Sequence, residues 1–152
     1  MVAKRRAEVT WENNLIRGTG RLRFGTGALP ETGVTWASRT ENPDGKTSPE
    51  ELLAAAHASC YAMALSATLA ANRTPPTRLD VAAVSTLDEV GGKWKVTVME
   101  LTVKGVVRGI SNSKFEEITK TAEAGCPISN TLRNNVEIRL SASLTEQAPG
   151  SK

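Results

Sequence analysis

Residues Ser48–Ala71 carry the sequence SPEELLAAAHASCYAMALSATLAA. Ser48 fits a helix N-cap, Pro49 fits the first helical position, and Glu51 stands three residues after the cap, which is a capping box. The segment after Glu51 contains no Asp, Glu, Lys or Arg, and nearly half of it is alanine. The stretch predicts one long helix from Pro49 to about Asn72, buried on most of its circumference because alanine lets neighbouring elements approach closely.

An uncharged run of this length also matches a membrane-spanning helix. Its composition does not, since alanine dominates, a histidine and several hydroxyl residues interrupt it, and no other segment resembles a span. The basic N-terminus, Lys4 to Arg6, is followed by polar residues rather than by an apolar segment, so nothing marks the chain for secretion. We therefore expect a cytoplasmic protein without a membrane segment.

The length of 152 residues suits one domain with its own core, which we place at residues 1–145, followed by a disordered tail at 146–152. The formal net charge is +3, and basic and acidic residues are interspersed rather than segregated into a stripe. This distribution argues against a nucleic-acid partner.

Strands are expected on both sides of the long helix. Alternating residues over 7–11, 20–24 and 34–37 predict an antiparallel meander that ends at the turn Asn42–Gly45. Residues 79–87 and 94–103 predict a hairpin around the glycine pair at 91–92. A strictly alternating strand is predicted at 136–144.

A second helix is expected to begin with a capping box at Ser113 and Glu116 and to stop at Gly125. Its predicted inner face consists of Phe115, Ile118, Thr119 and Ala122. The order of elements indicates an α+β fold, with antiparallel sheets around the long central helix.

The two cysteines are the candidate functional residues, because a cysteine pair in a reducing compartment is more often catalytic, redox-active or metal-binding than structural. Cys60 lies in mid-helix and gains little from the helix dipole, while His57, the sole histidine, lies three residues before it and within reach of the sulfur. Cys126 is predicted to cap a short helix that begins at Pro127, a setting that lowers the pKa of a thiol.

Several other interpretations remain open on these residues. The thiols can be unrelated core residues, and His57 a packed core histidine. His57, Cys60 and Cys126 with a carboxylate can form a zinc site, although no CxxC motif or second histidine supports one. A cysteine hydrolase is a poor match, because the single histidine shares the helix of the nucleophile. We expect no metal and no cofactor.

Three motifs together resemble the OsmC/Ohr family of osmotically inducible and organic hydroperoxide resistance proteins. They are Thr47–Cys60 followed by Met63-Ala64-Leu65, then Ala124–Ser129, and Arg17–Gly20 after Trp11-Glu12. The resemblance extends to about Leu144 and is closer to the OsmC branch than to Ohr.

The resemblance implies a thiol peroxidase that acts on organic hydroperoxides, and more weakly on hydrogen peroxide, in an intertwined homodimer with two sites between its subunits. Cys60 matches the peroxidatic cysteine and Cys126 the resolving cysteine. Glu50 matches a family glutamate, and Arg39 matches the arginine that contacts the thiolate, with Arg17 as its competitor. An external dithiol, such as that of a lipoylated protein, is the implied reductant.

Helix geometry adds one constraint. Glu50 and Cys60 are ten residues apart on one predicted helix, or roughly 15 Å along its axis, which a glutamate side chain does not span. If Glu50 belongs to the site of Cys60, it comes from another subunit. The simpler interpretations are a first-turn carboxylate at Glu50 and an exposed strand-end charge at Arg39. The competing function is a non-catalytic dimer that senses redox state or binds an apolar ligand.

Overall fold

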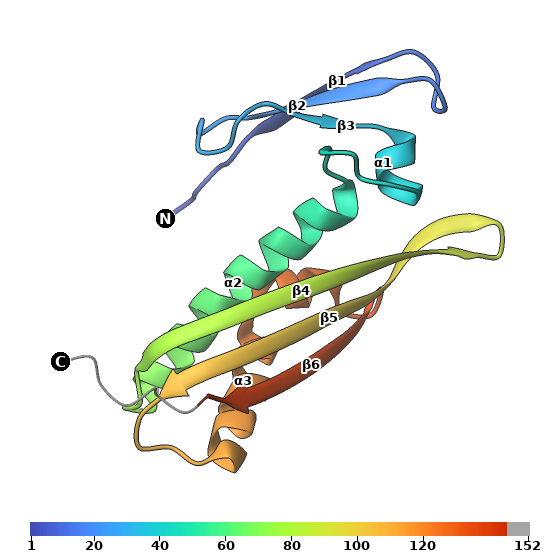
Figure 1. Ribbon diagram of the computed structural model, residues 1–152. Helices are drawn as coiled ribbons and strands as arrows, with labels where there is room; N and C mark the ends of the chain where they lie inside the picture. The colour runs from blue at the N-terminus through green and yellow to red at the C-terminus, as the bar shows by residue number, and fades with distance from the viewer. Residues whose placement is uncertain (146–152) are drawn as a thin grey trace. The chain divides into compact units, whose positions relative to one another are not determined.

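The computed structural model describes residues 1–145, so the predicted tail at 146–152 lies outside the described residues (Figure 1). Internal contacts divide the chain into two compact units, Met1–Leu52 and the remainder from Leu53 onward. Each unit is described by itself below. The assignment of residues 1–145 to a single domain stays a prediction.

The N-terminal unit contains a three-stranded antiparallel sheet in the order β1-β2-β3. Its strands are β1 (Ala7–Glu12), β2 (Thr19–Phe24) and β3 (Thr32–Val34). The predicted meander is therefore present, and the turn that ends it has positive φ angles of 48° at Asp44 and 71° at Gly45.

The third strand is present, but its predicted bounds of 34–37 are wrong: β3 ends at Val34, and a short helix, α1 (Trp36–Thr40), begins where the strand was expected to continue. Thr35 is its N-cap. The Thr35 hydroxyl accepts from the Ser38 amide at 3.0 Å, and the Ser38 hydroxyl accepts from the Thr35 amide at 2.9 Å. These side-chain bonds satisfy the backbone locally and end the strand.

The long helix is present as α2 (Pro49–Ala71), close to its predicted bounds. Its capping box is half formed. The Ser48 hydroxyl accepts from the Glu51 amide at 3.1 Å, but the Glu51 carboxylate accepts from the Thr47 hydroxyl at 2.6 Å instead of from the Ser48 amide.

One stripe of α2 is buried, at a spacing of four residues: His57, Tyr61, Leu65 and Leu69 are all fully inaccessible. The opposite face is open, and Met63 is 68% exposed. The expectation of burial on most of the circumference is therefore wrong for the single chain. By length and composition α2 is able to cross a membrane, but a core helix passes the same test, and the buried stripe with its histidine and tyrosine is typical of a core helix.

The C-terminal unit contains a second three-stranded sheet, in the order β4-β5-β6. Strands β4 (Pro76–Val90) and β5 (Lys93–Val107) form the predicted antiparallel hairpin around Gly91 and Gly92, both with positive φ. β6 (Glu137–Leu144) pairs with β5 in parallel, which corrects the expectation of purely antiparallel sheets. Two helices intervene between β5 and β6 and carry the chain back to the same end of the sheet, as a parallel pair requires.

These helices are α3 (Asn112–Gly125) and α4 (Pro127–Leu132). The N-cap of α3 is Ser111, whose hydroxyl accepts from the Lys114 amide at 3.2 Å, and not the predicted Ser113. The predicted inner face of α3 is confirmed, since Phe115, Ile118, Thr119 and Ala122 are its buried residues. Together with the stripe of α2 and with β5, this face forms the core of the unit (Figure 1).

Gly105 tests the packing of α3 on β5. A Cβ at this position would lie 2.5 Å from Cζ of the fully buried Phe115. We expect Gly105→Ala to lower the free energy of unfolding by about 1–3 kcal/mol, as overpacking of a tight core does. Urea denaturation of the purified variant measures this.

The matched control is Gly125→Ala, at the last residue of α3, where an added Cβ meets nothing within 4 Å. This variant is expected to keep or slightly raise the stability, because alanine favours a helix over glycine. Equal stabilities of the two variants would contradict the packing described here.

Candidate thiol site

The fold brings the two cysteines together inside the C-terminal unit. Both are free thiols; Cys126 is fully buried in the core cluster, and Cys60 is half-buried and packs against that cluster. Cys126 is close enough to Cys60 to help raise the pKa of the Cys60 thiol. The two thiols are therefore neighbours in one packed cluster, which is the first requirement for a disulfide between them.

The pKa of Cys60 is raised above its ordinary value. Burial is the main cause, because it disfavours the thiolate, and the neighbouring Cys126 adds to it. A hydrogen bond from the backbone amide of Ile128 acts in the opposite direction. Within its own chain, Cys60 is therefore a mostly protonated thiol with one donor directed at the sulfur.

Cys126 is the N-cap of α4 and Pro127 its first residue, as predicted. The Cys126 side chain, however, makes no capping hydrogen bond. The amide of Ile128, at the second position of α4, is directed at Cys60 of α2 instead. One amide at the start of α4 thus serves the other cysteine, which sequence spacing alone does not reveal.

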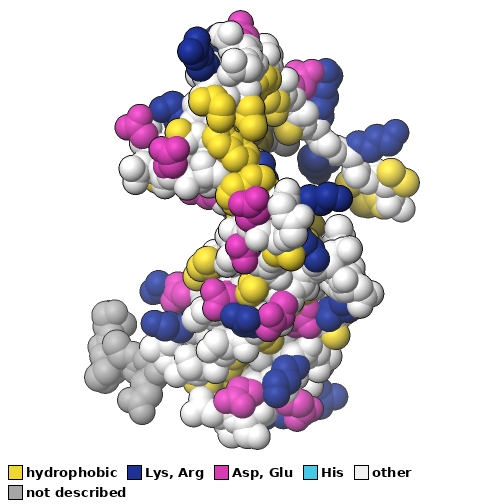
Figure 2. Space-filling view, turned by 90° about the vertical axis from the view of Figure 1, so that its right-hand side faces the viewer, with side chains coloured by type: hydrophobic (Ala, Val, Ile, Leu, Met, Phe, Trp, Pro, Cys, Tyr) yellow, Lys and Arg dark blue, Asp and Glu magenta, His cyan; other side chains and the backbone are white. Residues whose placement is uncertain are grey.

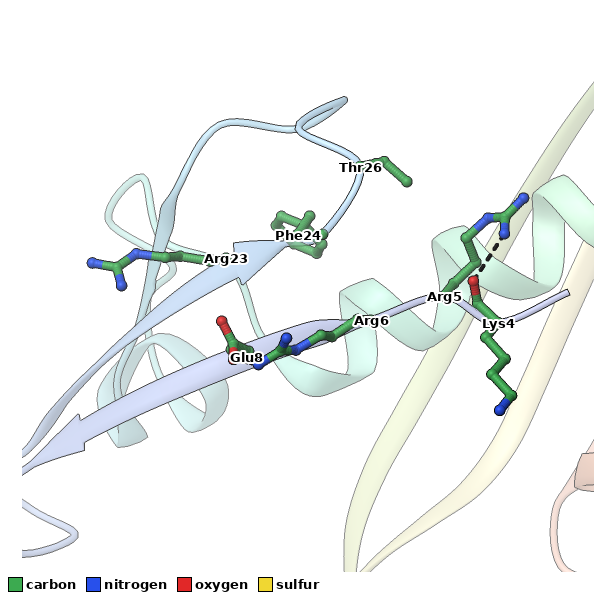
Figure 3. A pocket seen from close by; sticks show the side chains of 8 residues that line it. Lys4, Arg5, Arg6, Glu8, Arg23, Phe24 and Thr26 are labelled. Atoms are coloured by element: carbon green, nitrogen blue, oxygen red, sulfur yellow. Dashed lines mark hydrogen bonds and ion pairs between the residues drawn. The ribbon is translucent and has the colours of Figure 1, made fainter.

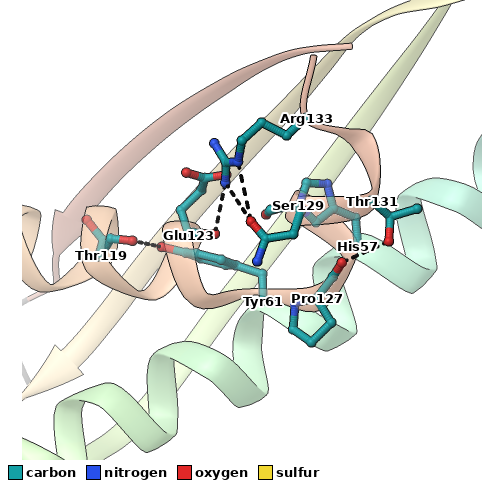
Figure 4. Close-up of polar contacts among 9 residues, drawn as sticks. His57, Tyr61, Thr119, Glu123, Pro127, Ser129, Thr131 and Arg133 are labelled. Atoms are coloured by element: carbon teal, nitrogen blue, oxygen red, sulfur yellow. Dashed lines mark hydrogen bonds and ion pairs between the residues drawn. The ribbon is translucent and has the colours of Figure 1, made fainter. Parts of the chain in front are cut away.

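His57 is fully buried, and its Nε2 lies 2.7 Å from Oγ of Ser129 on α4 (Figure 4). Its Nδ1 is buried and has no hydrogen-bond partner among the described residues. An unpartnered buried polar atom costs about 1–3 kcal/mol. Burial lowers the pKa of His57, against a smaller opposing effect of Glu123, so the imidazole is neutral at neutral pH.

Further polar contacts connect α2 and α4 to α3 (Figure 4). The Tyr61 hydroxyl donates to the carbonyl of Thr119 on α3 at 3.1 Å. Arg133, just after α4, pairs with Glu123 of α3 at 2.8 Å and donates to Oδ1 of Asn130 at 3.3 Å. Both α2 and α4 are thus held to α3 by directional bonds as well as by apolar packing.

The N-terminal unit holds an arginine–glutamate pair. Nη2 of Arg39 lies 2.7 Å from Oε1 of Glu50, and Nε lies 3.1 Å from both carboxylate oxygens. The Glu50 side chain is 9% exposed and the Arg39 side chain 29%, and the guanidinium carbon lies 5.8 Å from the centre of the Trp36 ring. Arg17 lies in the turn before β2 and makes no ion pair within residues 1–145.

A cavity of about 240 Å³ adjoins Arg39. Apart from Arg39 and Thr35, its walls are apolar: Val9, Trp11, Leu15, Leu22, Val34, Trp36, Pro49 and Leu52. Figure 2 shows hydrophobic side chains gathered on the surface of this unit, and Leu15 and Val9 are more than half exposed. A cation at the edge of an apolar hollow suits a ligand with one polar end.

A larger hollow of about 600 Å³ lies at the N-terminal segment, lined by Lys4, Arg5, Arg6 and Arg23 among others (Figure 3). Arg6 pairs with Glu8, and Arg23 pairs with Glu31 at 2.5 Å. The hollow contains neither a thiol nor a predicted site residue. Among residues 1–145, no group of three or more His, Cys, Asp or Glu side chains is arranged to hold a metal ion.

Sequence reasoning missed Ser129, the amide of Ile128 and Trp36. Ser129 lies three residues after Cys126, and His57 lies three residues before Cys60. This equal spacing is the one signal in the sequence that points to a contact between His57 and Ser129. The amide and the tryptophan ring carry no such signal, because their roles depend on which elements meet.

Comparisons with known proteins agree with this geometry. Residues 42–141 match the family model of OsmC-like proteins. The chain is 35% identical over 138 residues to the peroxiredoxin OsmC of Escherichia coli, covering 91% of this chain and 96% of that protein. It is 34% identical over 103 residues to the organic hydroperoxide resistance protein OhrA of Bacillus subtilis, covering 67% and 71%.

Among solved structures, an organic hydroperoxide resistance protein OsmC from Legionella pneumophila has the same fold, with a TM-score of 0.77 at 22% identity over 94% of this chain and 98% of that one. The names of these relatives support the prediction of a cysteine-based peroxidase. The longer match to the Escherichia coli protein agrees with the OsmC branch. This chain belongs to the family of OsmC-like proteins.

Proposed function

We propose that this protein reduces organic hydroperoxides, and more weakly hydrogen peroxide, to alcohols or water in cytoplasmic defence against oxidative and osmotic stress. The observation that carries the proposal is the packing of Cys60, on α2, against the buried cluster that contains Cys126, the N-cap of α4. The peroxiredoxin and hydroperoxide resistance names of the relatives point to the same reaction.

The reaction begins at Cys60. Its thiolate attacks one peroxide oxygen, so that an S–O bond forms and the O–O bond breaks, and the departing alkoxide takes up a proton to become the alcohol. Cys60 is left as a sulfenic acid. The Cys126 thiol then attacks that sulfur, forming an intrasubunit disulfide and releasing water, and an external dithiol restores both thiols by exchange. A lipoylated protein is the reductant that we propose.

Cys60 needs a cation to become a thiolate, because its own surroundings raise its pKa. Arg39 carries that cation, and Glu50 orients it through charge-assisted hydrogen bonds to both Nε and Nη2. Glu50 and Cys60 are ten residues apart on α2, or about 15 Å along a helix axis. We therefore propose that Arg39 and Glu50 of one subunit serve Cys60 of a second, which gives two sites in a homodimer.

The apolar cavity beside Arg39 supports organic over inorganic peroxides. Its walls favour an alkyl or aryl group, and Arg39 at its edge is able to bind the peroxide oxygens. Hydrogen peroxide gains nothing from the walls. The same cavity also suits the competing function, a dimer that binds an apolar ligand or senses redox state without turnover.

Turnover separates these two functions. We expect the wild type to consume many equivalents of cumene hydroperoxide when a dithiol is supplied, and fewer with a monothiol, because a dithiol completes the exchange within one molecule. Cys60→Ser should lose all consumption above background, as measured by the loss of hydroperoxide with time. Oxidation that stops after one equivalent per thiol pair would support the sensor and contradict the enzyme.

Cys126→Ser tests the resolving step. After one equivalent of hydroperoxide, the intact mass of the wild type should fall by two hydrogens, whereas the variant should gain one oxygen and stay there. The mass spectrum of each quenched sample gives the answer. A lasting sulfenic acid in the wild type, with no disulfide formed, would remove Cys126 from this role.

Arg39→Gln should shift the pH profile of the Cys60 reaction to higher pH. Without the cation the raised pKa of Cys60 is no longer offset, so less thiolate is present at neutral pH and the rate of peroxide reduction at pH 7 falls, by about 100-fold for the loss of one charged donor. Rates measured from pH 5 to 10 check this. Arg17→Gln is the matched control and should keep the wild-type profile; the reverse result would transfer the role to Arg17.

A further inference from the structure

Each cysteine has a polar residue three positions away, and these two polar residues bind each other. His57 precedes Cys60 on α2, and Ser129 follows Cys126 on α4. The His57 and Ser129 side chains are fully buried and 2.7 Å apart. The thiol contact and this hydrogen bond therefore join the same two helices within one turn of each other.

The hydrogen bond does not serve packing alone. An apolar side chain at position 57 would fill the space without burying an unpartnered Nδ1 atom, which is what His57 does among the described residues. What the imidazole adds is a bond with a required direction. That bond fixes α4, a helix of only six residues, against α2 on the side that carries Cys126.

We propose that His57 is a positioning residue for the resolving step, acting through Ser129 to hold α4 so that the sulfur of Cys126 faces the sulfenic acid of Cys60. In that step the S–S bond forms, the S–O bond of Cys60 breaks, and the proton of the Cys126 thiol leaves with the hydroxyl as water. The inference rests on the proposed function, and it assigns a task to the one histidine of the chain, which the peroxide chemistry leaves unused.

Four variants separate positioning from general loosening. His57→Leu and Ser129→Ala remove the bond from either side, while His57→Gln places an amide near the position of Nε2 and keeps it. Tyr61→Phe is the matched control, because it deletes another buried hydrogen bond of α2, the one to Thr119 on α3, and leaves α4 untouched.

The first readout follows a single turnover. After one equivalent of tert-butyl hydroperoxide, quenched samples are analysed by intact mass for sulfenic acid and disulfide. We expect disulfide formation to slow by roughly tenfold or more in His57→Leu and in Ser129→Ala, as a small misplacement of reacting groups does. The double variant should be no slower than either single one, and His57→Gln and Tyr61→Phe should resemble the wild type.

Wild-type rates in both His57→Leu and Ser129→Ala would overturn the inference, and so would an equal delay in Tyr61→Phe. Should one variant fail to fold, the other still decides.

The second readout needs no peroxide. Equilibration of each protein with oxidised and reduced dithiothreitol measures how readily the Cys60–Cys126 disulfide forms, and loss of positioning should shift this equilibrium toward the thiols by roughly tenfold. An unchanged equilibrium would contradict the inference. A wild type that forms the disulfide but consumes no hydroperoxide would instead refute the proposed function, and this readout would still decide on His57.

Discussion

The burial of a thiol at the contact between α2 and α4 is the constraint on which the chemistry of this protein depends. Removing Cys60 from water disfavours its thiolate, and the neighbouring thiol of Cys126 adds to the effect. The single amide of Ile128 offsets only part of it. The same packing that makes the two thiols neighbours thus favours the protonated, less nucleophilic form of Cys60.

The Arg39–Glu50 pair has the properties of such a charge. Glu50 is nearly inaccessible, Arg39 makes three hydrogen bonds to it, and the Trp36 ring lies against the guanidinium. A guanidinium held in this way loses little further freedom when it binds an anion. The cavity that Arg39 lines has mostly apolar walls, so this charge lies next to an apolar surface.

Sequence patterns predicted the parts whose causes are local. The Ser48 cap and the proline after it set the start of α2, and the spacing of Phe115, Ile118, Thr119 and Ala122 set the inner face of α3. Motifs alone led to the family. Patterns failed where contacts between residues distant in sequence determine the structure. They did not predict the parallel pairing of β6 with β5, the helix α1 at residues expected to form a strand, or the exposed face of α2.

The candidate site shows the same division. The sequence Gly-Cys-Pro was enough to predict that Cys126 caps α4. It did not predict that the Ile128 amide of α4 donates to Cys60, because this contact depends on how α2 packs against α4. His57 appeared on sequence grounds to be a neighbour of Cys60, and its bond to Ser129, 72 residues away, gives it a different partner.

The central claim is that Cys60 of one subunit is activated by Arg39 and Glu50 of another. Mixing unfolded Cys60→Ser and Arg39→Gln chains in equal amounts, followed by refolding, tests it most directly. Each parent is expected to be inactive or nearly so, whereas the mixture should recover roughly a quarter of the wild-type rate, because half of the dimers are mixed and each has one intact site. A mixture no more active than its parents, with mixed dimers shown to be present by native mass, would contradict the claim.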